Sequence, residues 1–182
     1  MPKKYSISSI VRYSAFLFVF AIFAFTVLTY AAAYPRKYKP IVKKYGALYG
    51  LDENLVYAVI KTESSFNAEA VSAKGAAGLM QIIPPTAEYI SIKWYNGEKY
   101  DLLNPETNVK YGCKYLAHLI EKFNGVETGL AAYNAGEGKV AIWLADENCS
   151  DNGKTLKTIP YKETADYVQK VLKRRMIYSV LY

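Results

Sequence analysis

The sequence predicts an all-α protein in which one long apolar helix precedes a helical domain. Three observations lead to this fold class. Apolar residues recur at helical spacing in several segments after residue 50, short polar turns separate these segments, and strand-like alternation is weak throughout. The chain of 182 residues suits one domain with an appendage. The part beyond the apolar helix is long enough to bury a hydrophobic core.

The first element is the apolar segment 13–34, which contains no charged residue and has tyrosines near both ends. It is long enough to cross a hydrocarbon core of about 30 Å as a helix, and tyrosine rings favour the lipid headgroup region. We interpret it as an uncleaved transmembrane signal anchor that follows a cytoplasmic segment, 1–12. One alternative is a cleaved signal peptide, with release of a secreted protein near Ala33. The other alternative is a buried core helix.

Basic residues lie on both sides of this segment, and more of them follow it than precede it. The positive-inside rule therefore does not place the following domain outside the cell. The expectation of a single-pass membrane protein with an extracytoplasmic domain rests instead on the chemistry inferred below, because its substrate exists only outside the cell.

A short juxtamembrane linker, 35–40, leads into the predicted domain at 41–182. The first clear helix there begins at Asp52, a favourable N-cap residue, and continues to Ser64. Its apolar residues Leu55, Val56 and Val59 share one face. The later elements are helices that open at Pro84 and then span Pro105–Phe123, Val126–Asn134, Lys139–Ala145 and Lys162–Leu181, with an irregular or hairpin insert at Ser91–Tyr100.

The formal net charge is +7, and the basic residues are scattered along the chain. No nucleic-acid-binding motif accompanies them, so we expect no nucleic-acid partner. Charges that flank the apolar segment suit anionic lipid. The others suit a polyanionic cell wall or an ordinary soluble surface.

His118 is the only histidine, which gives little support to a histidine-based metal site or a catalytic triad. We expect no metal and no cofactor. Cys113 and Cys149 are the only cysteines, and outside the cell they could form a disulfide. Because Cys113 continues a helical apolar pattern, a free buried thiol is the preferred interpretation.

Glu63 is the residue that points to chemistry. It lies four residues after Val59 and seven after Val56, so it continues the apolar face of its helix. A partly desolvated carboxyl group has a raised pKa and stays protonated near neutral pH. Such a group can donate a proton to a glycosidic oxygen and take one back. From spacing alone, a carboxylate that only caps a turn or pairs with a lysine is equally compatible.

Four motifs in order strengthen the catalytic interpretation. They resemble those of the Slt-type (family 1) lytic transglycosylases, which share a goose-type lysozyme fold. The motifs are Glu63-Ser64, Gly78-Leu79-Met80-Gln81, Ala132-Tyr133-Asn134 and the closing segment Pro160–Val168. The resemblance covers most of the chain beyond the apolar segment and implies a lysozyme-like helical domain. Glu137, Ile83 and Ala165 depart from the common pattern, and Ala165 replaces an arginine that is frequent in the family.

The resemblance implies that Glu63 is the single catalytic acid and base. It also implies a set of substrate-binding residues: Ser72, Gly78, Met80, Gln81, Tyr133, Asn134 and Tyr167. The substrate would be a peptidoglycan glycan strand, cleaved at the bond from N-acetylmuramic acid to N-acetylglucosamine without water. The product would be a 1,6-anhydromuramoyl end.

Two rival functions remain open. A hydrolytic muramidase on the same fold would need a second carboxylate opposite Glu63, and Asp101, Glu137 and Glu163 are candidates. A protein that binds the cell wall without cleaving it would keep the fold for glycan binding alone.

Overall fold

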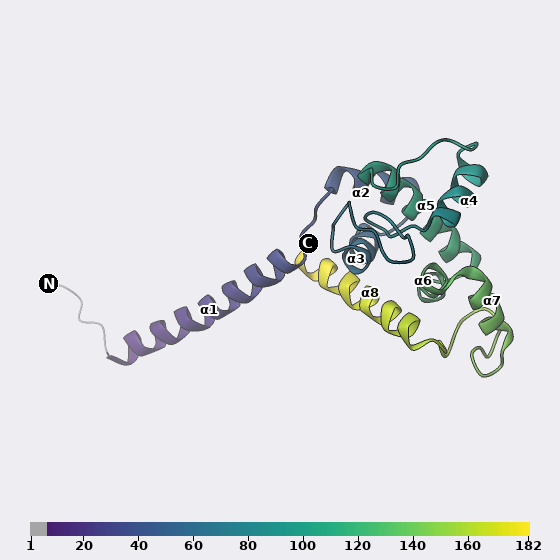
Figure 1. The fold of residues 1–182 in the computed structure, drawn as a ribbon. Coiled ribbons are helices and arrows are strands. Elements are labelled where there is room, and N and C mark those ends of the chain that lie inside the picture. Colours follow the sequence, from purple (N-terminus) through teal and green to yellow (C-terminus); the bar gives the residue numbers. More distant parts are fainter. Residues whose placement is uncertain (1–6) are drawn as a thin grey trace. The chain divides into compact units, whose positions relative to one another are not determined.

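The apolar N-terminal segment forms one helix, α1 (Ile7–Ala33) (Figure 1). The computed structural model describes residues 7–182, and α1 belongs to a unit separate from Arg36–Val180. From Val11 to Ala33, α1 has the length and composition to cross a membrane, and none of this span is buried inside the protein. No other helix in the described part of the chain has the length and composition to cross a membrane. The expectation of one N-terminal apolar helix is confirmed, and the buried core helix is wrong.

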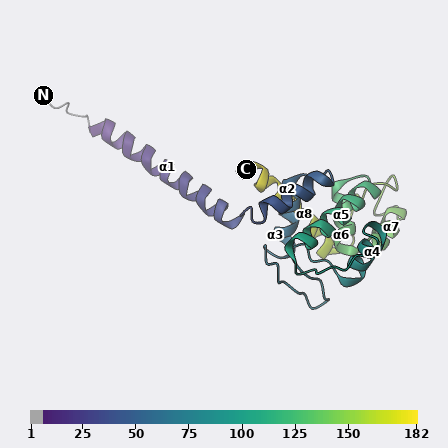
Figure 2. The ribbon, with the colours of Figure 1, turned by 90° about the horizontal axis from the view of Figure 1, so that it is seen from above.

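Arg36–Val180 form the helical domain (Figures 1 and 2). Its helices are α2 (Lys39–Leu48), α3 (Glu53–Glu63), α4 (Pro84–Trp94), α5 (Pro105–Lys122), α6 (Val126–Ala135), α7 (Glu137–Ala145) and α8 (Lys162–Leu181). Among the described residues, β pairing is limited to two isolated bridges in the segment 71–82. The all-α class is therefore confirmed.

The helix α3 forms the core of the domain. The Asp52 side chain caps it by accepting a hydrogen bond from the Asn54 amide at 3.0 Å. All six residues from Leu55 to Ile60 are buried, so the predicted apolar stripe is covered on every side rather than on one face. The helix α2 packs against α3. The helix α8 also contacts it, because the rings of Tyr57 and Tyr178 stack with centroids 5.4 Å apart.

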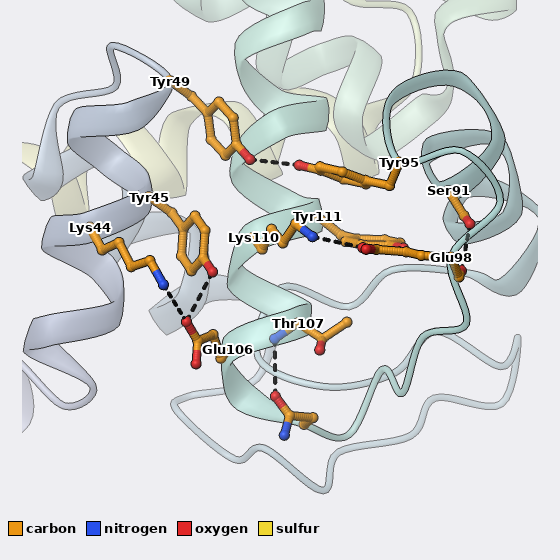
Figure 3. Close-up of polar contacts among 11 residues, drawn as sticks. Lys44, Tyr45, Tyr49, Ser91, Tyr95, Glu98, Glu106, Thr107, Lys110 and Tyr111 are labelled. Carbon is orange, nitrogen blue, oxygen red and sulfur yellow. Dashed lines mark hydrogen bonds and ion pairs between the residues drawn. The ribbon is translucent and has the colours of Figure 1, made fainter.

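The helix α5 contacts α2, α4 and α6. Figure 3 shows polar contacts that hold α2 and the 95–100 turn against it. Glu106 of α5 accepts hydrogen bonds from Lys44 Nζ at 2.6 Å and Tyr45 Oη at 3.0 Å on α2. Lys110 Nζ of α5 pairs with Glu98 Oε1 of the turn at 2.7 Å.

Three boundaries differ from the expected ones. The helix α2 begins at Lys39, inside the segment expected to be a linker. The helix α4 continues to Trp94, so the expected insert shrinks to residues 95–100. The Ser91 hydroxyl explains this, since it donates to the Glu98 carbonyl at 2.7 Å and closes the turn onto the end of α4. The helix α7 starts two residues early, at Glu137.

The irregular segment 64–83 between α3 and α4 depends on one buried amide. Asn108 of α5 is 0% exposed. Its Oδ1 accepts from the Met80 amide at 2.7 Å, and its Nδ2 donates to the carbonyls of Ala77 at 2.9 Å and Leu102 at 2.8 Å. A segment without regular structure must satisfy its buried backbone groups through such partners.

We predict that Asn108→Ala lowers the free energy of unfolding by about 3 kcal/mol, because it removes the hydrogen-bond partner of the Met80 amide and of the Leu102 carbonyl and one of the two donors to the Ala77 carbonyl. Urea unfolding of the full chain in mild detergent, followed by tryptophan fluorescence, measures this. The control is Glu121→Ala at an exposed position of the same helix, with an expected change within about 0.5 kcal/mol. Equal urea midpoints for the two variants would contradict the anchoring role of Asn108.

Candidate active site

Glu63 is the last residue of α3, and it is only partly exposed. Its Oε1 accepts a hydrogen bond from the Tyr167 hydroxyl of α8 at 2.7 Å. When the carboxyl group is protonated, Oε1 is then the carbonyl oxygen and Oε2 carries the proton. The contact joins two motifs that lie 104 residues apart in the sequence.

Burial raises the pKa of Glu63 from 4.5 to about 7, and the Tyr167 hydrogen bond opposes this rise. Burial dominates because it disfavours the charged carboxylate more than one donated hydrogen bond stabilises it. Near neutral pH, Glu63 is therefore present in comparable amounts as acid and base. A group of this kind can act in both directions of proton transfer.

Two tyrosine hydroxyls lie in the electrostatic field of Glu63. The pKa values of Tyr133 and Tyr167 are raised well above the usual value, first by burial and next by the Glu63 charge. Both hydroxyls therefore stay protonated and act as hydrogen-bond donors. Tyr167 donates to Glu63, and Tyr133 donates to the Met80 carbonyl at 2.9 Å.

The backbone of Leu79 and Met80 is fixed at three successive polar groups. The Ser64 hydroxyl, directly after Glu63, donates to the Leu79 carbonyl at 2.9 Å. Asn108 accepts from the Met80 amide, and Tyr133 donates to the Met80 carbonyl. These contacts bind the segment to α3, α5 and α6, so the backbone beside Glu63 has one defined position.

A glycine is required at position 78 because Asn108 and the Leu102 backbone approach it closely. Its φ of +75° lies in the left-handed region, and a Cβ there would lie 2.2 Å from both Asn108 Nδ2 and the Leu102 carbonyl oxygen. Gln81 also has a positive φ, 49°. Its side-chain amide donates to the carbonyls of Gly78 at 2.9 Å and Ala70 at 3.1 Å, which stabilises this conformation.

The remaining predicted substrate-binding residues differ in their surroundings. Ser72 is exposed, and its hydroxyl accepts a hydrogen bond from the Ala76 amide at 3.0 Å. Met80 is fully buried, and its sulfur occupies the space beside Gly112 of α5, where a Cβ would lie 2.4 Å away. Asn134 is exposed, and its Oδ1 accepts from the Thr164 hydroxyl at 2.8 Å.

The structure therefore brings Glu63, Tyr167 and Tyr133 close enough for their charges to interact. Tyr167 is hydrogen-bonded to Glu63 and Tyr133 to the Met80 backbone, while Ser72 and Gln81 bond to the backbone of the 70–82 segment. Sequence reasoning missed two polar residues that support these contacts, Asn108 and Thr164, and it gave Ser64 no role of its own. Asn108 gave one usable signal, since it is a polar residue next to the apolar residues of its helix.

Neither cysteine is paired, and both are buried. Burial raises the pKa of the Cys113 thiol, in agreement with the preferred free-thiol interpretation. Within the described residues, no group of three or more His, Cys, Asp and Glu side chains could hold a metal ion.

We predict that Glu63→Gln stabilises the protein only above acidic pH. Between pH 4.5 and 7 the folded state keeps a proton on Glu63 that the unfolded state has lost, so stability falls as pH rises through this window. Glutamine cannot ionise. The gain in free energy of unfolding should be near zero below pH 4.5 and should reach at most about 3 kcal/mol above pH 7.

Urea unfolding of the full chain at several pH values from about 4 to 8 measures this difference. The control is the same substitution at the exposed Glu88 of α4, which should leave the pH dependence unchanged. A Glu63→Gln gain that is constant across pH would show that burial does not raise the pKa of Glu63.

The matching family model, two similar sequences and a similar solved structure all describe transglycosylases. The model of the Transglycosylase SLT domain matches residues 40–155. The soluble lytic murein transglycosylase of Escherichia coli strain K12 is 35% identical over 145 residues, which cover 76% of this chain and 22% of that protein. The membrane-bound lytic murein transglycosylase C of Histophilus somni strain 2336 is 32% identical over 179 residues, covering 85% of this chain and 49% of that protein.

A solved structure shows the same fold. It is an inactive glutamate-to-glutamine variant of the lytic transglycosylase Slt from Pseudomonas aeruginosa, with a TM-score of 0.69 and 33% identity. The match covers 81% of this chain and 24% of that one, so this chain spans half or less of the length of each of these relatives. The predicted lysozyme-like, Slt-type fold is confirmed, and the chain belongs to the SLT family of transglycosylases.

Proposed function

We propose that this protein is a lytic murein transglycosylase that cleaves peptidoglycan glycan strands, with Glu63 as its only catalytic acid and base. The observation that carries the proposal is the partly buried Glu63 carboxyl group, whose pKa is about 7. It occupies the glutamate position of the Glu-Ser motif in a chain of the SLT family. The inactive Pseudomonas aeruginosa variant, in which a glutamine replaces a glutamate, supports a catalytic glutamate in that relative.

The first step of the proposed reaction is proton donation. Oε2 of protonated Glu63 gives its proton to the oxygen that links N-acetylmuramic acid to N-acetylglucosamine. The bond from C1 of the muramic acid to that oxygen breaks, and the leaving sugar departs with a hydroxyl group. The cation-like sugar that remains is stabilised by its own N-acetyl group. Tyr167 holds Oε1 and thereby orients the carboxyl group.

The second step returns the proton. Glu63, now ionised, accepts the proton of the C6 hydroxyl on the same muramic acid. Its O6 then forms a bond to C1, which gives a 1,6-anhydro ring and restores protonated Glu63. No water is consumed and no metal takes part in this sequence. A pKa near 7 suits both steps because neither proton transfer is strongly uphill at neutral pH.

No second carboxylate among the described residues acts on Glu63, which favours this mechanism over hydrolysis. Most glycosidases need two carboxylates that flank the scissile bond. The causes that shift the pKa of Glu63 are burial and the Tyr167 hydroxyl, and no carboxylate among the described residues contributes. Of the candidate partners, Glu137 pairs with Lys122, and Asp101 accepts a hydrogen bond from the Leu103 amide.

We propose that the seven substrate-binding residues implied by the family resemblance contribute to glycan binding around Glu63. Ser72 and Asn134 are exposed and would contact the sugars directly. Tyr133, Tyr167 and Gln81 would do so with partly or largely buried side chains. Met80 and Gly78 are buried, so they would act by placing the backbone of the 78–81 segment next to the substrate.

The proposed location follows from α1 and from the substrate. We propose that α1 anchors the protein to the cell membrane as a single span and that the domain 41–182 faces the outside, where peptidoglycan lies. The membrane-bound relative from Histophilus somni supports anchoring. Residues 1–12 would then lie in the cytoplasm.

We predict that a cysteine introduced at the exposed position 154, as Lys154→Cys, reacts with a membrane-impermeant maleimide in intact cells. The two native cysteines are buried and should label weakly. The matched variant Ser6→Cys should react only after the cells are lysed. The reverse pattern of labelling would place the domain in the cytoplasm and would contradict the proposed location.

We predict that Glu63→Gln abolishes glycan cleavage, with a loss of at least about a thousandfold, because the amide can neither donate nor accept the transferred proton. The assay is mass spectrometry of fragments released from purified peptidoglycan by the full chain in detergent. The parent chain should release fragments one water lighter than hydrolysed ones. Glu88→Gln should cleave at the parental rate.

The products separate the rival functions. Fragments with free reducing ends would make the protein a hydrolytic muramidase and would require a second carboxylate. Peptidoglycan binding without any released fragment would favour a non-catalytic wall-binding protein. Cleavage by Glu63→Gln at the parental rate would remove Glu63 from the mechanism.

A further inference from the structure

A cluster of aromatic and cationic side chains lies where the ends of α2 and α4 meet α5. We call Tyr49, Lys93, Trp94, Lys114 and His118 the cationic aromatic patch. Lys114 Nζ lies 5.2 Å from the centroid of the Trp94 ring and 5.5 Å from that of Tyr49. Lys93 Nζ lies 4.8 Å from the same Trp94 ring. The Trp94 and His118 rings meet edge to face at 5.1 Å.

The charge of this patch is not neutralised within the domain. Within the part of the chain that the structure describes, neither Lys93 nor Lys114 has a carboxylate partner. The surrounding lysines do: Lys44 pairs with Glu106 and Lys110 with Glu98 (Figure 3), and Lys122 pairs with Glu137. The patch therefore carries two lysine charges without ion pairs among the described residues, and the Glu137 and Glu121 charges act on it through His118.

Hydrogen bonds and ring contacts hold the aromatic groups of the patch in place. The hydroxyls of Tyr49 and Tyr95 share a hydrogen bond of 2.6 Å between α2 and the end of α4 (Figure 3). The Tyr95 ring in turn stacks on Tyr111 of α5, with centroids 5.1 Å apart. Trp94 also meets the Tyr89 ring edge to face at 5.5 Å. A ligand would thus find a preformed surface and would order few side chains on binding.

A line of rings connects the patch to the candidate active site. Tyr133, whose hydroxyl holds the Met80 carbonyl, contacts Tyr115 with centroids 5.8 Å apart. Tyr115 contacts Tyr89 at 6.4 Å, and Tyr89 contacts Trp94 at 5.5 Å. Three ring contacts thus link Trp94 to Tyr133, which lies in the electrostatic field of Glu63.

We propose that the cationic aromatic patch binds carboxylate-bearing sugar units of the same glycan strand, outside the site of cleavage. This inference rests on the proposed function, because it takes peptidoglycan as the substrate. The flat Trp94 ring offers an apolar surface to the apolar face of a pyranose ring. Lys93 is exposed and Lys114 is half-buried. Contacts between an ammonium and a ring are weak at exposed sites, and Lys93 has one further partner, the Tyr89 hydroxyl. Both lysines can therefore exchange these contacts for a carboxylate of the strand.

The two lysines act as mobile charges, while His118 acts as a neutral hydrogen-bonding group. Burial and the charge of Lys93 lower the pKa of His118, which keeps its ring uncharged at neutral pH. Peptidoglycan supplies carboxylates from two sources: the stem peptide, and the lactyl group of muramic acid once the peptide has been removed. Both sources present the same chemistry to the lysines.

The test measures binding separately from cleavage. The full chain in detergent carries Glu63→Gln in every sample, and its binding to insoluble peptidoglycan is measured by sedimentation at low and high salt. Trp94→Ala should weaken binding about tenfold, and the double variant Lys93→Gln with Lys114→Gln should weaken it about tenfold as well. The double variant should also reduce the salt dependence. Lys154→Gln, at an exposed lysine outside the patch, should bind like the parent.

Peptidoglycan stripped of its stem peptides by an amidase identifies the carboxylate. A lysine effect confined to intact peptidoglycan identifies the stem peptide as the partner, and an effect seen only after stripping identifies the lactyl carboxylate that the amidase exposes. An effect on both materials assigns both carboxylates to the patch. Equal binding of the parent and the double lysine variant on both materials would overturn the proposal. So would a lysine effect that requires phosphate-bearing wall polymers and vanishes after their removal by acid.

The double lysine variant keeps the test decisive if Trp94→Ala disturbs the fold, because Lys93 is exposed and Lys114 is only half-buried. Cleavage by the chain with Glu63 intact is measured in parallel. Cleavage with unchanged binding of the patch variants would remove only the patch proposal. Absence of cleavage, with weaker binding of the same variants, would remove the proposed function and keep the patch as a glycan-binding site.

Discussion

The site depends on the desolvation of one carboxyl group at the end of a buried helix. Leu55–Ile60 are covered on every side, and Glu63 lies where α3 leaves this core. At that position Glu63 is partly exposed and loses much of its hydration, which raises its pKa to about 7. Tyr167 then supplies one hydrogen bond without restoring the ordinary pKa.

This carboxyl group needs an immobile neighbourhood, although the backbone beside it has no regular secondary structure. Polar groups from three helices meet that need: Ser64, Asn108 and Tyr133 bind the Leu79–Met80 backbone. Each is a hydrogen bond made in a largely dry environment, where leaving a partner unpaired is costly. The stability of the domain and the geometry of the site therefore rest on the same contacts.

Periodicity and caps were sufficient to predict the fold class, the N-terminal apolar helix and the helix that begins at Asp52 and carries Glu63. They placed Glu63 on an apolar face but left its partner unknown, because Tyr167 is 104 residues away. Family motifs named Tyr167, Tyr133 and Gln81 without their contacts. The role of Asn108 lay beyond reach, since its three partners come from two separate loops. The patch at Trp94 depends on packing between helices, which periodicity does not describe.

Stability and chemistry make opposite demands on Glu63. Above pH 7 the folded domain holds a charged carboxylate in a poorly hydrated position, and a neutral side chain there would make the fold more stable. A more polar site would lower the pKa and remove the acid form that proton donation needs. Because the proposed mechanism uses one group as both acid and base, its pKa has to stay near the working pH. The buried residues of α3 and the raised pKa of Glu63 are thus two consequences of one arrangement.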